Sequence, residues 1–223
     1  MTSPPDLVRG DDRIRRCAWG ASTPDYARYH DDEWGRPVVD DTRIFEKLCL
    51  EGFQSGLSWL TILRKRENFR SAFADFDIPT VAAFSDRDRD RLLGDAGIVR
   101  HRGKIEAAMA NARAALVVQR DRSLASLFWS FAPRGRGLAP RTMADLPAKT
   151  AESTALSKAL RAHGFRFVGP TTMYAAMQSL GVVNDHLVGC ASRAACARSR
   201  KAMSALPRSS EDRGARRAVR PCR

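Results

Sequence analysis

The sequence predicts an all-α fold, and three observations lead to this prediction. Apolar residues recur at three- and four-residue spacings along most of the chain, which is the pattern of helices with one buried face. No segment alternates apolar and polar residues between hairpin turns, as paired strands do. With 223 residues, 43% of them hydrophobic and 28% charged, the chain is long enough for one domain with a substantial core.

The expected helices begin at capping residues and end near glycines or prolines. The hydroxyl of Thr23 followed by Pro24 predicts a helix start, because proline suits the first helical position. A second helix is expected from Thr42 until Gly56 interrupts it, and Ser58 is expected to cap a third. Further helices are expected where apolar positions recur, namely Ser85–Leu93, Gly103–Leu116, Leu124–Phe131, Ser153–His163 and Pro170–Leu180, with Pro133–Pro140 as the longest irregular loop.

We expect three parts along the chain: a flexible N-terminal extension over residues 1–15, one folded domain over 16–190, and a basic, disordered tail over 191–223. The tail contains ten Lys/Arg and two acidic residues, so it carries +8 of the net charge of +13 and residues 1–190 carry +5. It is rich in Ala, Ser and Arg and has no sustained apolar period, which is typical of a mobile arm. A plain solvated extension and an arm that binds polyanions both fit this composition.

Composition also excludes several classes of protein. The longest apolar stretches, such as Val81–Phe84, are far shorter than the ~20 residues of a membrane-spanning helix, so no membrane partner is expected. The N-terminal segment carries three aspartates and no apolar stretch after its charges, which is unlike a secretory signal. Five cysteines without regular spacing favour reduced thiols or metal ligation over a disulfide framework. We therefore expect a cytoplasmic protein.

Two cysteines and two histidines form the first candidate site. Cys17 and His30 lie near the N-terminus, whereas His186 and Cys190 lie near the end of the expected domain. The spacing of His186 and Cys190 would place an imidazole and a thiolate on the same side of a helix, and two such pairs make a tetrahedral ligand set for zinc. Four protein ligands leave no open position, so such a metal would be structural. The alternative is that the cysteines are small buried hydrophobes and the histidines ordinary core or surface residues.

The second candidate site is the segment from Leu92 to Ile105. A helix is expected to end there, a glycine-bearing turn to follow, and a new helix to begin among basic residues. Backbone N–H groups at such a turn and helix start attract phosphate, and the segment is similar to a helix-hairpin-helix clamp for the DNA backbone. The residues assigned to DNA contact are Gly97, Arg100, Arg102 and Lys104. A simple corner between two helices with a solvated basic rim is the alternative.

The third candidate site combines a carboxylate with aromatic rings. Glu51 lies in an otherwise apolar helix, where a carboxylate must find donors or take a raised pKa. Trp59 follows one turn later, and Trp19 and Tyr29 lie in an aromatic group earlier in the chain. Indole faces beside a carboxylate suit a flat, cationic ring, through stacking, cation–π attraction and a charged hydrogen bond. Packing of these rings in the core is the alternative.

The motifs taken together carry a family resemblance over about residues 16–190. They agree in order and spacing with those of the bacterial, constitutive DNA-3-methyladenine glycosylase I, a family of the helix-hairpin-helix glycosylase superfamily, which the chain resembles. The segments concerned are Cys17-x-Trp19, Tyr29–Gly35, Cys49–Gly52, Gly56–Trp59, Arg66–Asn68, Asp95–Ile98, Arg100–Ile105, Gly164–Gly169 and Asn184–Cys190.

The resemblance implies a helix-hairpin-helix glycosylase fold with a structural zinc ion held by Cys17, His30, His186 and Cys190. It implies that the enzyme rotates 3-methyladenine out of double-stranded DNA and hydrolyses its N-glycosidic bond in base-excision repair, leaving an abasic site. The chain is expected to act on DNA that contains alkylated purines, as a monomer. In the base pocket Glu51 and Tyr29 correspond to catalytic residues, Trp59 and Trp19 to base-binding ones, and Gly56 and Leu57 to the element that approaches DNA.

Two other functions remain open at this point. One is a DNA-binding module that keeps the zinc cluster and the hairpin but has lost its chemistry; an intact Glu51 and Trp59 argue against it. The other is a glycosylase for a different alkylated purine, such as 3-methylguanine. A panel of substrates separates these possibilities.

Overall fold

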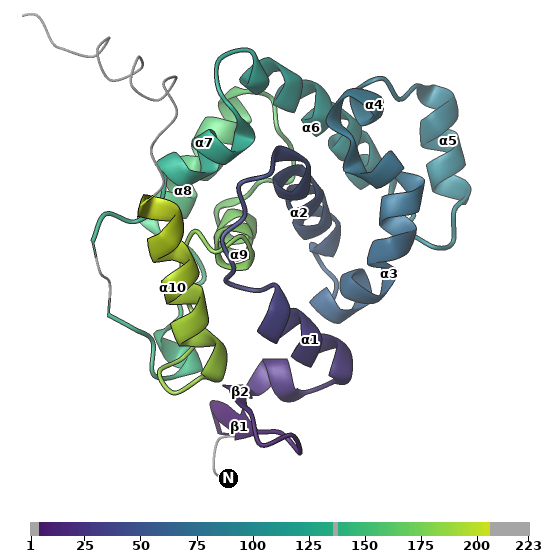
Figure 1. The fold of residues 1–223 in the computed structure, drawn as a ribbon. Helices are drawn as coiled ribbons and strands as arrows, with labels where there is room; N and C mark the ends of the chain where they lie inside the picture. Colours follow the sequence, from purple (N-terminus) through teal and green to yellow (C-terminus); the bar gives the residue numbers. More distant parts are fainter. Residues whose placement is uncertain (1–4, 136–137, 206–223) are drawn as a thin grey trace, which may run out of the picture.

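The computed structural model describes residues 5–135 and 138–205, which form ten α-helices, three short 3-10 helices and one two-stranded hairpin (Figure 1). The mostly helical architecture agrees with the prediction. The α-helices are α1 (Pro24–Asp32), α2 (Asp41–Gln54), α3 (Trp59–Ala72), α4 (Ile78–Ala82), α5 (Asp86–Gly94), α6 (Arg102–Gln119), α7 (Leu124–Ser130), α8 (Ala151–Ala162), α9 (Pro170–Ser179) and α10 (Ala191–Ala205). The 3-10 helices are η1 (Ala18–Ala21), η2 (Ala74–Phe76) and η3 (Met143–Asp145).

Side-chain caps fix the starts of the helices that carry the site. The hydroxyl of Thr23 accepts a hydrogen bond from the backbone N–H of Tyr26 at 3.2 Å, and Pro24 follows it, as predicted. Ser58 caps α3 by accepting from Thr61 N at 3.2 Å. The helix expected from Thr42 begins at Asp41, because Asp40 is the residue that caps it. Such caps each stabilise a helix by about 1 kcal/mol.

The core surrounds α2, which lies in the middle of the molecule and contacts α3, α6, α7 and α9 (Figure 1). Its side chains Phe45 and Phe53 are almost completely buried, and the ring of Phe53 lies 4.7 Å from that of Phe69 in α3. Burial of each such side chain contributes about 1.5–3 kcal/mol. Because α2 is packed on several sides, the polar residues on it are held in fixed positions.

A hairpin near the N-terminus departs from the expected absence of strands and from the expected flexible extension. Strand β1 (Leu7–Arg9) pairs antiparallel with β2 (Arg15–Cys17), and Leu7 lies opposite Cys17. The connecting turn is held by Asp12, whose carboxylate accepts from Ile14 N at 3.0 Å. Strands of three residues are too short to show a two-residue period, which is why the sequence pattern missed them.

Helix α10 departs from the disordered tail expected over residues 191–223. Residues 191–205 are helical, Cys196 and Ser192 are buried, and Asn184 donates a hydrogen bond to the carbonyl oxygen of Arg193 at 3.1 Å. The buried face consists of small side chains four positions apart, which carry little hydrophobic signal in the sequence. Residues 206–223 lie outside the described part of the chain. Among the helices that are described, none has both the length and the apolar character needed to cross a membrane.

Candidate active site and metal centre

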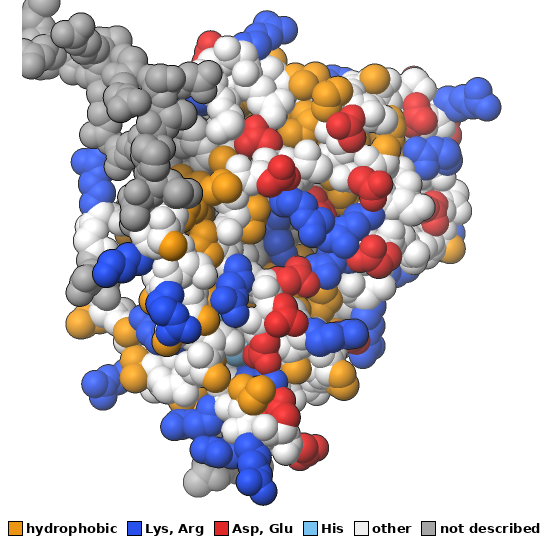
Figure 2. Space-filling model, in the orientation of Figure 1, with side chains coloured by type: hydrophobic (Ala, Val, Ile, Leu, Met, Phe, Trp, Pro, Cys, Tyr) orange, Lys and Arg blue, Asp and Glu red, His pale blue; other side chains and the backbone are white. Residues whose placement is uncertain are grey.

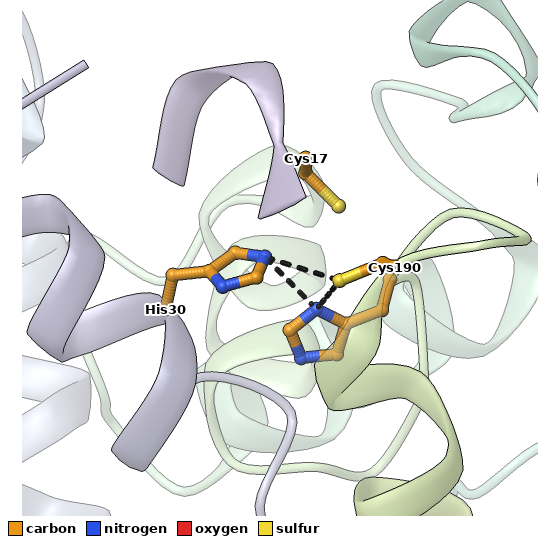
Figure 3. A group of neighbouring side chains, drawn as sticks. Cys17, His30 and Cys190 are labelled. Carbon is orange, nitrogen blue, oxygen red and sulfur yellow. Dashed lines mark hydrogen bonds between the residues drawn. The ribbon is translucent and has the colours of Figure 1, made fainter. Parts of the chain in front are cut away.

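Four side chains from distant parts of the chain meet in one buried cluster. Cys17 comes from β2, His30 from α1, and His186 and Cys190 from the segment between α9 and α10; Figure 3 shows Cys17, His30 and Cys190 pointing toward one another. The predicted group of residues is therefore brought together. His186 and Cys190 lie on a turn rather than on a helix, with Cys190 N donating to Leu187 O at 3.0 Å.

The distances within the cluster match those of a tetrahedral ligand set. Nε2 of His30 lies 3.2 Å from Nδ1 of His186, and Sγ of Cys190 lies 3.5 Å from each of these nitrogens. Zinc bonds of about 2.0–2.1 Å to nitrogen and 2.3 Å to sulfur give tetrahedral edges of roughly 3.3–3.8 Å. All four ligand atoms lie within 4.8 Å of one another. The cluster can hold a metal ion, and its two thiols and two imidazoles favour zinc.

A second layer of residues orients the two imidazoles. Nδ1 of His30 lies 2.7 Å from Oδ1 of Asp31, and this carboxylate in turn accepts hydrogen bonds from the buried guanidinium of Arg16. Nε2 of His186 lies 2.9 Å from the carbonyl oxygen of Trp34. These partners leave Nε2 of His30 and Nδ1 of His186 facing the cluster, which is the arrangement found around metal-binding histidines.

The sulfur atoms of the cluster differ in their surroundings. A hydrogen bond from Cys17 lowers the pKa of the Cys190 thiol most strongly, and the imidazoles of His186 and His30 lower it further. Thiolate is the form of cysteine that binds metal. The hydrogen bond to Cys190 and burial raise the pKa of the Cys17 thiol, and the backbone N–H of Leu187, 3.4 Å from its Sγ, opposes this rise.

The carboxylate and the aromatic rings of the third candidate site also lie together. Glu51 in α2 is only 4% exposed, Tyr29 in α1 is buried, and Trp59, the first residue of α3, is partly exposed. The ring centroids of Tyr29 and Trp59 are 5.5 Å apart. The indole N–H of Trp59 is buried and forms no hydrogen bond within the described part of the chain. We call Glu51, Tyr29 and Trp59 the aromatic chamber.

Burial controls the protonation states of Glu51 and Tyr29 in the chamber. It raises the pKa of Glu51 to about 7, and the positive charge of Lys47 limits the rise. Among the described residues no hydrogen-bond donor to the Glu51 carboxylate is found, and the ammonium of Lys47 is the positive charge that acts on it. Burial and the neighbouring charge of Glu51 raise the pKa of the Tyr29 phenol well above its ordinary value, so the phenol stays neutral.

Lys47 is a residue of the chamber that the sequence reasoning missed. Its ammonium lies 4.3 Å from the ring centroid of Trp59 and 4.7 Å from that of Tyr29, and donates to the Tyr29 hydroxyl at 3.0 Å. The available signal was its position four residues before Glu51, which places both on one face of α2. Burial lowers the pKa of Lys47 to about 8, and the charge of Glu51 opposes this shift.

Trp19 joins the chamber to the Cys/His cluster. Its ring centroid lies 5.2 Å from that of His30 and 6.3 Å from that of Tyr29. It also packs against the buried group formed by Cys17, Leu187 and Cys190. The close contact between η1 and α1 requires Gly20, because a Cβ atom there would lie 2.5 Å from the His30 ring. Trp19 therefore contacts both the Cys/His cluster and the chamber.

The segment between α2 and α3 presents an apolar side chain to solvent. Gly56 has a φ of 81°, which favours glycine, and Leu57 after it is 41% exposed. Lys104 from α6 holds this segment, since its ammonium donates to Phe53 O at 2.9 Å and to Ser55 O at 2.5 Å. This differs from the expectation for Lys104: a buried ammonium bound to two carbonyl oxygens positions the loop and is not displayed to a phosphate.

The turn between α5 and α6 exposes two of the basic residues expected to contact DNA, and one of them has an acidic partner, since Nη1 of Arg102 lies 3.7 Å from a carboxylate oxygen of Glu106. Arg100 and Arg102 are exposed. Gly97 has an internal role, because its N–H donates to Asp95 at 2.7 Å and its carbonyl oxygen accepts from Lys65 at 3.1 Å. At the start of α6 the N–H of Lys104 already donates to Nδ1 of His101 at 3.2 Å, which leaves the N–H groups of Arg102 and Gly103 as those of this turn that can face an anion.

Opposite charges alternate across α1, α2 and α3 beside the chamber. Figure 2 shows basic and acidic side chains next to one another over this part of the surface. Arg66 in α3 pairs with Glu33, donating to its carboxylate at 2.5 and 2.9 Å. Arg70 in turn pairs with the buried Glu46 at 2.8 Å. These pairs fix α3, and with it Trp59, against the helices that carry Tyr29 and Glu51.

Comparison with known proteins places this geometry in a family. A model described as methyladenine glycosylase matches residues 19–194. The chain belongs to the methyladenine glycosylase family. It is 48% identical over 179 residues to DNA-3-methyladenine glycosylase 1 of Escherichia coli (strain K12), which covers 79% of this chain and 96% of that protein. It is 44% identical over 177 residues to DNA-3-methyladenine glycosylase of Haemophilus influenzae, covering 78% and 96%.

Solved structures of the methyladenine glycosylase family share the fold. A crystal structure of 3-methyladenine DNA glycosylase I matches with a TM-score of 0.76 and 47% identity, over 79% of this chain and 98% of that one. The enzyme from Staphylococcus aureus, studied for its recognition of 3-methyladenine, matches with a TM-score of 0.76 and 37% identity, over 80% and 96%. As a member of this family the protein is a DNA glycosylase of the constitutive type I class, a hydrolase of N-glycosyl bonds.

Proposed function

We propose that the protein acts in base-excision repair by rotating 3-methyladenine out of duplex DNA and hydrolysing its N-glycosidic bond, which leaves an abasic site. The observation that carries the proposal is the buried carboxyl of Glu51, which accepts no hydrogen bond from the described residues, beside the tilted rings of Tyr29 and Trp59, whose centroids are 5.5 Å apart. The family relatives named for this activity support it.

The chemistry suits a site that selects and positions its substrate. Methylation at N3 gives adenine a positive charge, so the base accepts the electrons of the bond between N9 and C1′ and leaves as neutral 3-methyladenine. Water adds to C1′ and its proton goes to solvent. Such a leaving group needs little acid catalysis, and the enzyme can work through discrimination and orientation. Extrusion costs a few kcal/mol and is less costly for a damaged base.

The residues of the chamber have separate roles in this proposal. Trp59 stacks on the extruded ring, and the Glu51 carboxylate accepts a hydrogen bond from its N–H groups, which favours a cationic base over normal adenine. Tyr29, kept neutral by burial, contributes a hydrogen bond. Trp19 forms a wall of the pocket. Glu51 and Tyr29 are the catalytic residues.

The DNA duplex binds at the first turn of α6. We assign phosphate contacts to Arg100 and Arg102 and to the amide groups of a helix-hairpin-helix formed by α5, the Gly97 turn and α6. Leu57 approaches the space that the extruded base has left. Lys104 ties Ser55 to α6, so the phosphate contacts and the Leu57 loop keep a fixed separation.

A zinc ion held by Cys17, His30, His186 and Cys190 has a structural role. The donor set and the 3.2–3.5 Å separations between three of its atoms fit such an ion. When bound, the ion would cross-link the N-terminal and C-terminal parts of the domain. It would take no part in the reaction, because protein ligands fill all four of its coordination positions.

The direct test is the release of free base from alkylated duplex DNA, followed by chromatography. The expected product is 3-methyladenine together with abasic sites in the DNA. Absence of released base from folded, zinc-loaded protein that still binds DNA would identify a binding module and end the enzymatic proposal. Release of 3-methylguanine in preference to 3-methyladenine would redirect it to a different alkylated purine. The molecular mass in solution, expected to be that of a monomer, is measured on the same sample.

A further inference from the structure

An aromatic side chain outside the chamber is held exposed to solvent. Phe167, in the segment between α8 and α9, is 41% exposed, the same fraction as Leu57 in the loop assigned to DNA contact. Phe165 and Val168, on either side of it along the chain, are buried. The backbone of Phe167 has a φ of 55°, in the left-handed region that bulky residues rarely adopt. Such conformations persist where the surrounding structure fixes them, and they cluster at functional sites.

Buried polar side chains fix the backbone on both sides of Phe167. Asn111 of α6 is 2% exposed; its Nδ2 donates to the carbonyl oxygen of Arg166 at 3.1 Å, and its Oδ1 accepts from the N–H of Arg166 at 2.7 Å. The buried hydroxyl of Ser157 in α8 donates to Val168 O at 2.6 Å. Two buried polar groups therefore hold a segment whose aromatic side chain is exposed.

Phe167 lies beside the elements that are proposed to approach DNA. A Cβ atom on Gly52 of α2 would lie 3.4 Å from Cβ of Phe167. Phe167 also borders a small depression together with Gly52 and Lys104. The ammonium of Lys104 in turn holds Ser55, two residues before Leu57. Both exposed apolar side chains therefore belong to segments placed around Lys104, near the start of α6.

The residue before Phe167 adds positive charge to this surface. Arg166 is exposed and lines an open cleft together with Glu106 of α6. Glu106 is the acidic partner of Arg102, at 3.7 Å. The segment that carries Phe167 is therefore continuous with the first turns of α6, where phosphate contacts are assigned.

We propose that Phe167 is a second DNA-inserting side chain, which stacks on the base that loses its partner when the lesion is rotated out of the duplex. The inference rests on the proposed function, because it requires an extruded base. The space that one base leaves takes one side chain, and that space is assigned to Leu57. A second apolar side chain on the same surface then meets the partner base. Aromatic rings stack on bases, and apolar side chains inserted into the stack are typical of proteins that distort duplex DNA.

The test measures affinity for two duplexes that contain a tetrahydrofuran analogue of the abasic site. In the first duplex the analogue lies opposite thymine, and in the second it lies opposite another analogue, so the partner base is missing. Phe167→Ala should bind the first duplex about tenfold more weakly than the unaltered chain, the factor expected for one stacking contact between a base and an aromatic ring. It should bind the second duplex as tightly as the unaltered chain does.

Matched variants separate stacking from a structural effect. Phe167→Tyr keeps an aromatic ring and should keep the affinity for both duplexes. Leu57→Ala should weaken binding to both, because the space assigned to Leu57 is present in both. Val117→Ala, which truncates another exposed apolar side chain of α6, should change neither affinity. A displaced segment in Phe167→Ala would weaken binding to both duplexes equally, unlike the loss of a contact with the partner base.

A measurement on the unaltered chain keeps the inference testable if Phe167→Ala does not fold. 5-Iodouracil replaces the thymine opposite the analogue, and irradiation cross-links it to an aromatic side chain in contact with it. Mass spectrometry should locate the cross-link at Phe167. Equal affinity of folded Phe167→Ala and the unaltered chain for the first duplex, an equal loss on both duplexes, or no cross-link at Phe167 overturns the inference. Failure of the unaltered chain to prefer either duplex over undamaged DNA would instead count against the proposed extrusion of a base.

Discussion

The Nε2 atom of His30 lies 3.2 Å from Nδ1 of His186, although 156 positions separate the two residues. Tyr29 is the neighbour of His30 in α1, so the contact that closes the Cys/His cluster also fixes the helix carrying the phenol of the chamber. The ring of Trp19, 5.2 Å from His30 and 6.3 Å from Tyr29, provides a second connection. The Cys/His cluster and the aromatic chamber are therefore structurally coupled.

Loss of the metal should destabilise the protein. Cys190→Ser is expected to reduce the zinc content from one ion per chain to near zero and to lower the free energy of unfolding by several kcal/mol, about the loss expected for a structural zinc ligand. Metal analysis and thermal unfolding check this. Cys49→Ser is the matched control, because Cys49 is equally buried but lies in the core of α2. Equal zinc content in both variants would contradict the assignment.

The activity should rise with pH around neutrality. The pKa of Glu51 is raised to about 7 by burial, and the ionised form is the one that attracts a cationic base. The rate of base release under single-turnover conditions should therefore increase as pH rises from 6 to 8, with one ionisation near 7. A profile that is flat across this range, measured with an enzyme that stays folded, would remove Glu51 from that role.

Stability should change with pH in the opposite direction. The folded state holds the Glu51 proton up to about pH 7, whereas the unfolded chain releases it near the ordinary value of 4.5. The folded state therefore binds more protons in this interval, and Glu51 lowers the free energy of unfolding as pH rises from 4.5 to 7. Glu51→Gln should lose this contribution. Denaturant unfolding at pH 5 and pH 8 measures the difference, and an identical pH dependence in both proteins would contradict it.

Lys104 and the exposed arginines should have different effects on DNA binding. Arg102→Gln is expected to weaken binding to all sequences and to reduce the slope of log K against log salt by about one, because one phosphate contact is lost. Lys104→Met should leave that slope unchanged and reduce the rate of base release, since it frees the loop that carries Leu57. It should also lower the free energy of unfolding by about 1–3 kcal/mol. A reduced salt slope in Lys104→Met would show that its ammonium reaches DNA after all.

The sequence predicted the elements that depend on local chemistry. Thr23 and Ser58 are caps whose hydrogen bonds reach only three residues along the chain, and both were found where expected. The hairpin at residues 7–17 depends on pairing between short strands, and α10 on a buried face of small residues such as Cys196. Neither the short paired strands nor the small buried residues of α10 produce a strong local pattern of apolar residues in the sequence.

The residues of the candidate site also divide into those that a local motif predicts and those whose positions depend on tertiary packing. The motifs identified Glu51, Tyr29 and the four cluster residues because their types and spacing carry chemical meaning. The positions of the lysines are decided by tertiary packing: Lys47 lies over rings from α1 and α3, and Lys104 reaches carbonyl oxygens about 50 positions away. The four-residue spacing to Glu51 places Lys47 on the face of α2 that carries this carboxylate, but nothing in the sequence shows what the ammonium of either lysine contacts.

The most direct test of the account compares the unaltered chain with Glu51→Gln on duplex DNA containing 3-methyladenine. Single-turnover release of the base and affinity for the same DNA are measured together. We expect release to slow by about 10²-fold or more while affinity for undamaged duplex changes little, because the amide cannot neutralise a cationic base. Release at the full rate by Glu51→Gln would contradict the central claim that this buried carboxylate recognises the base.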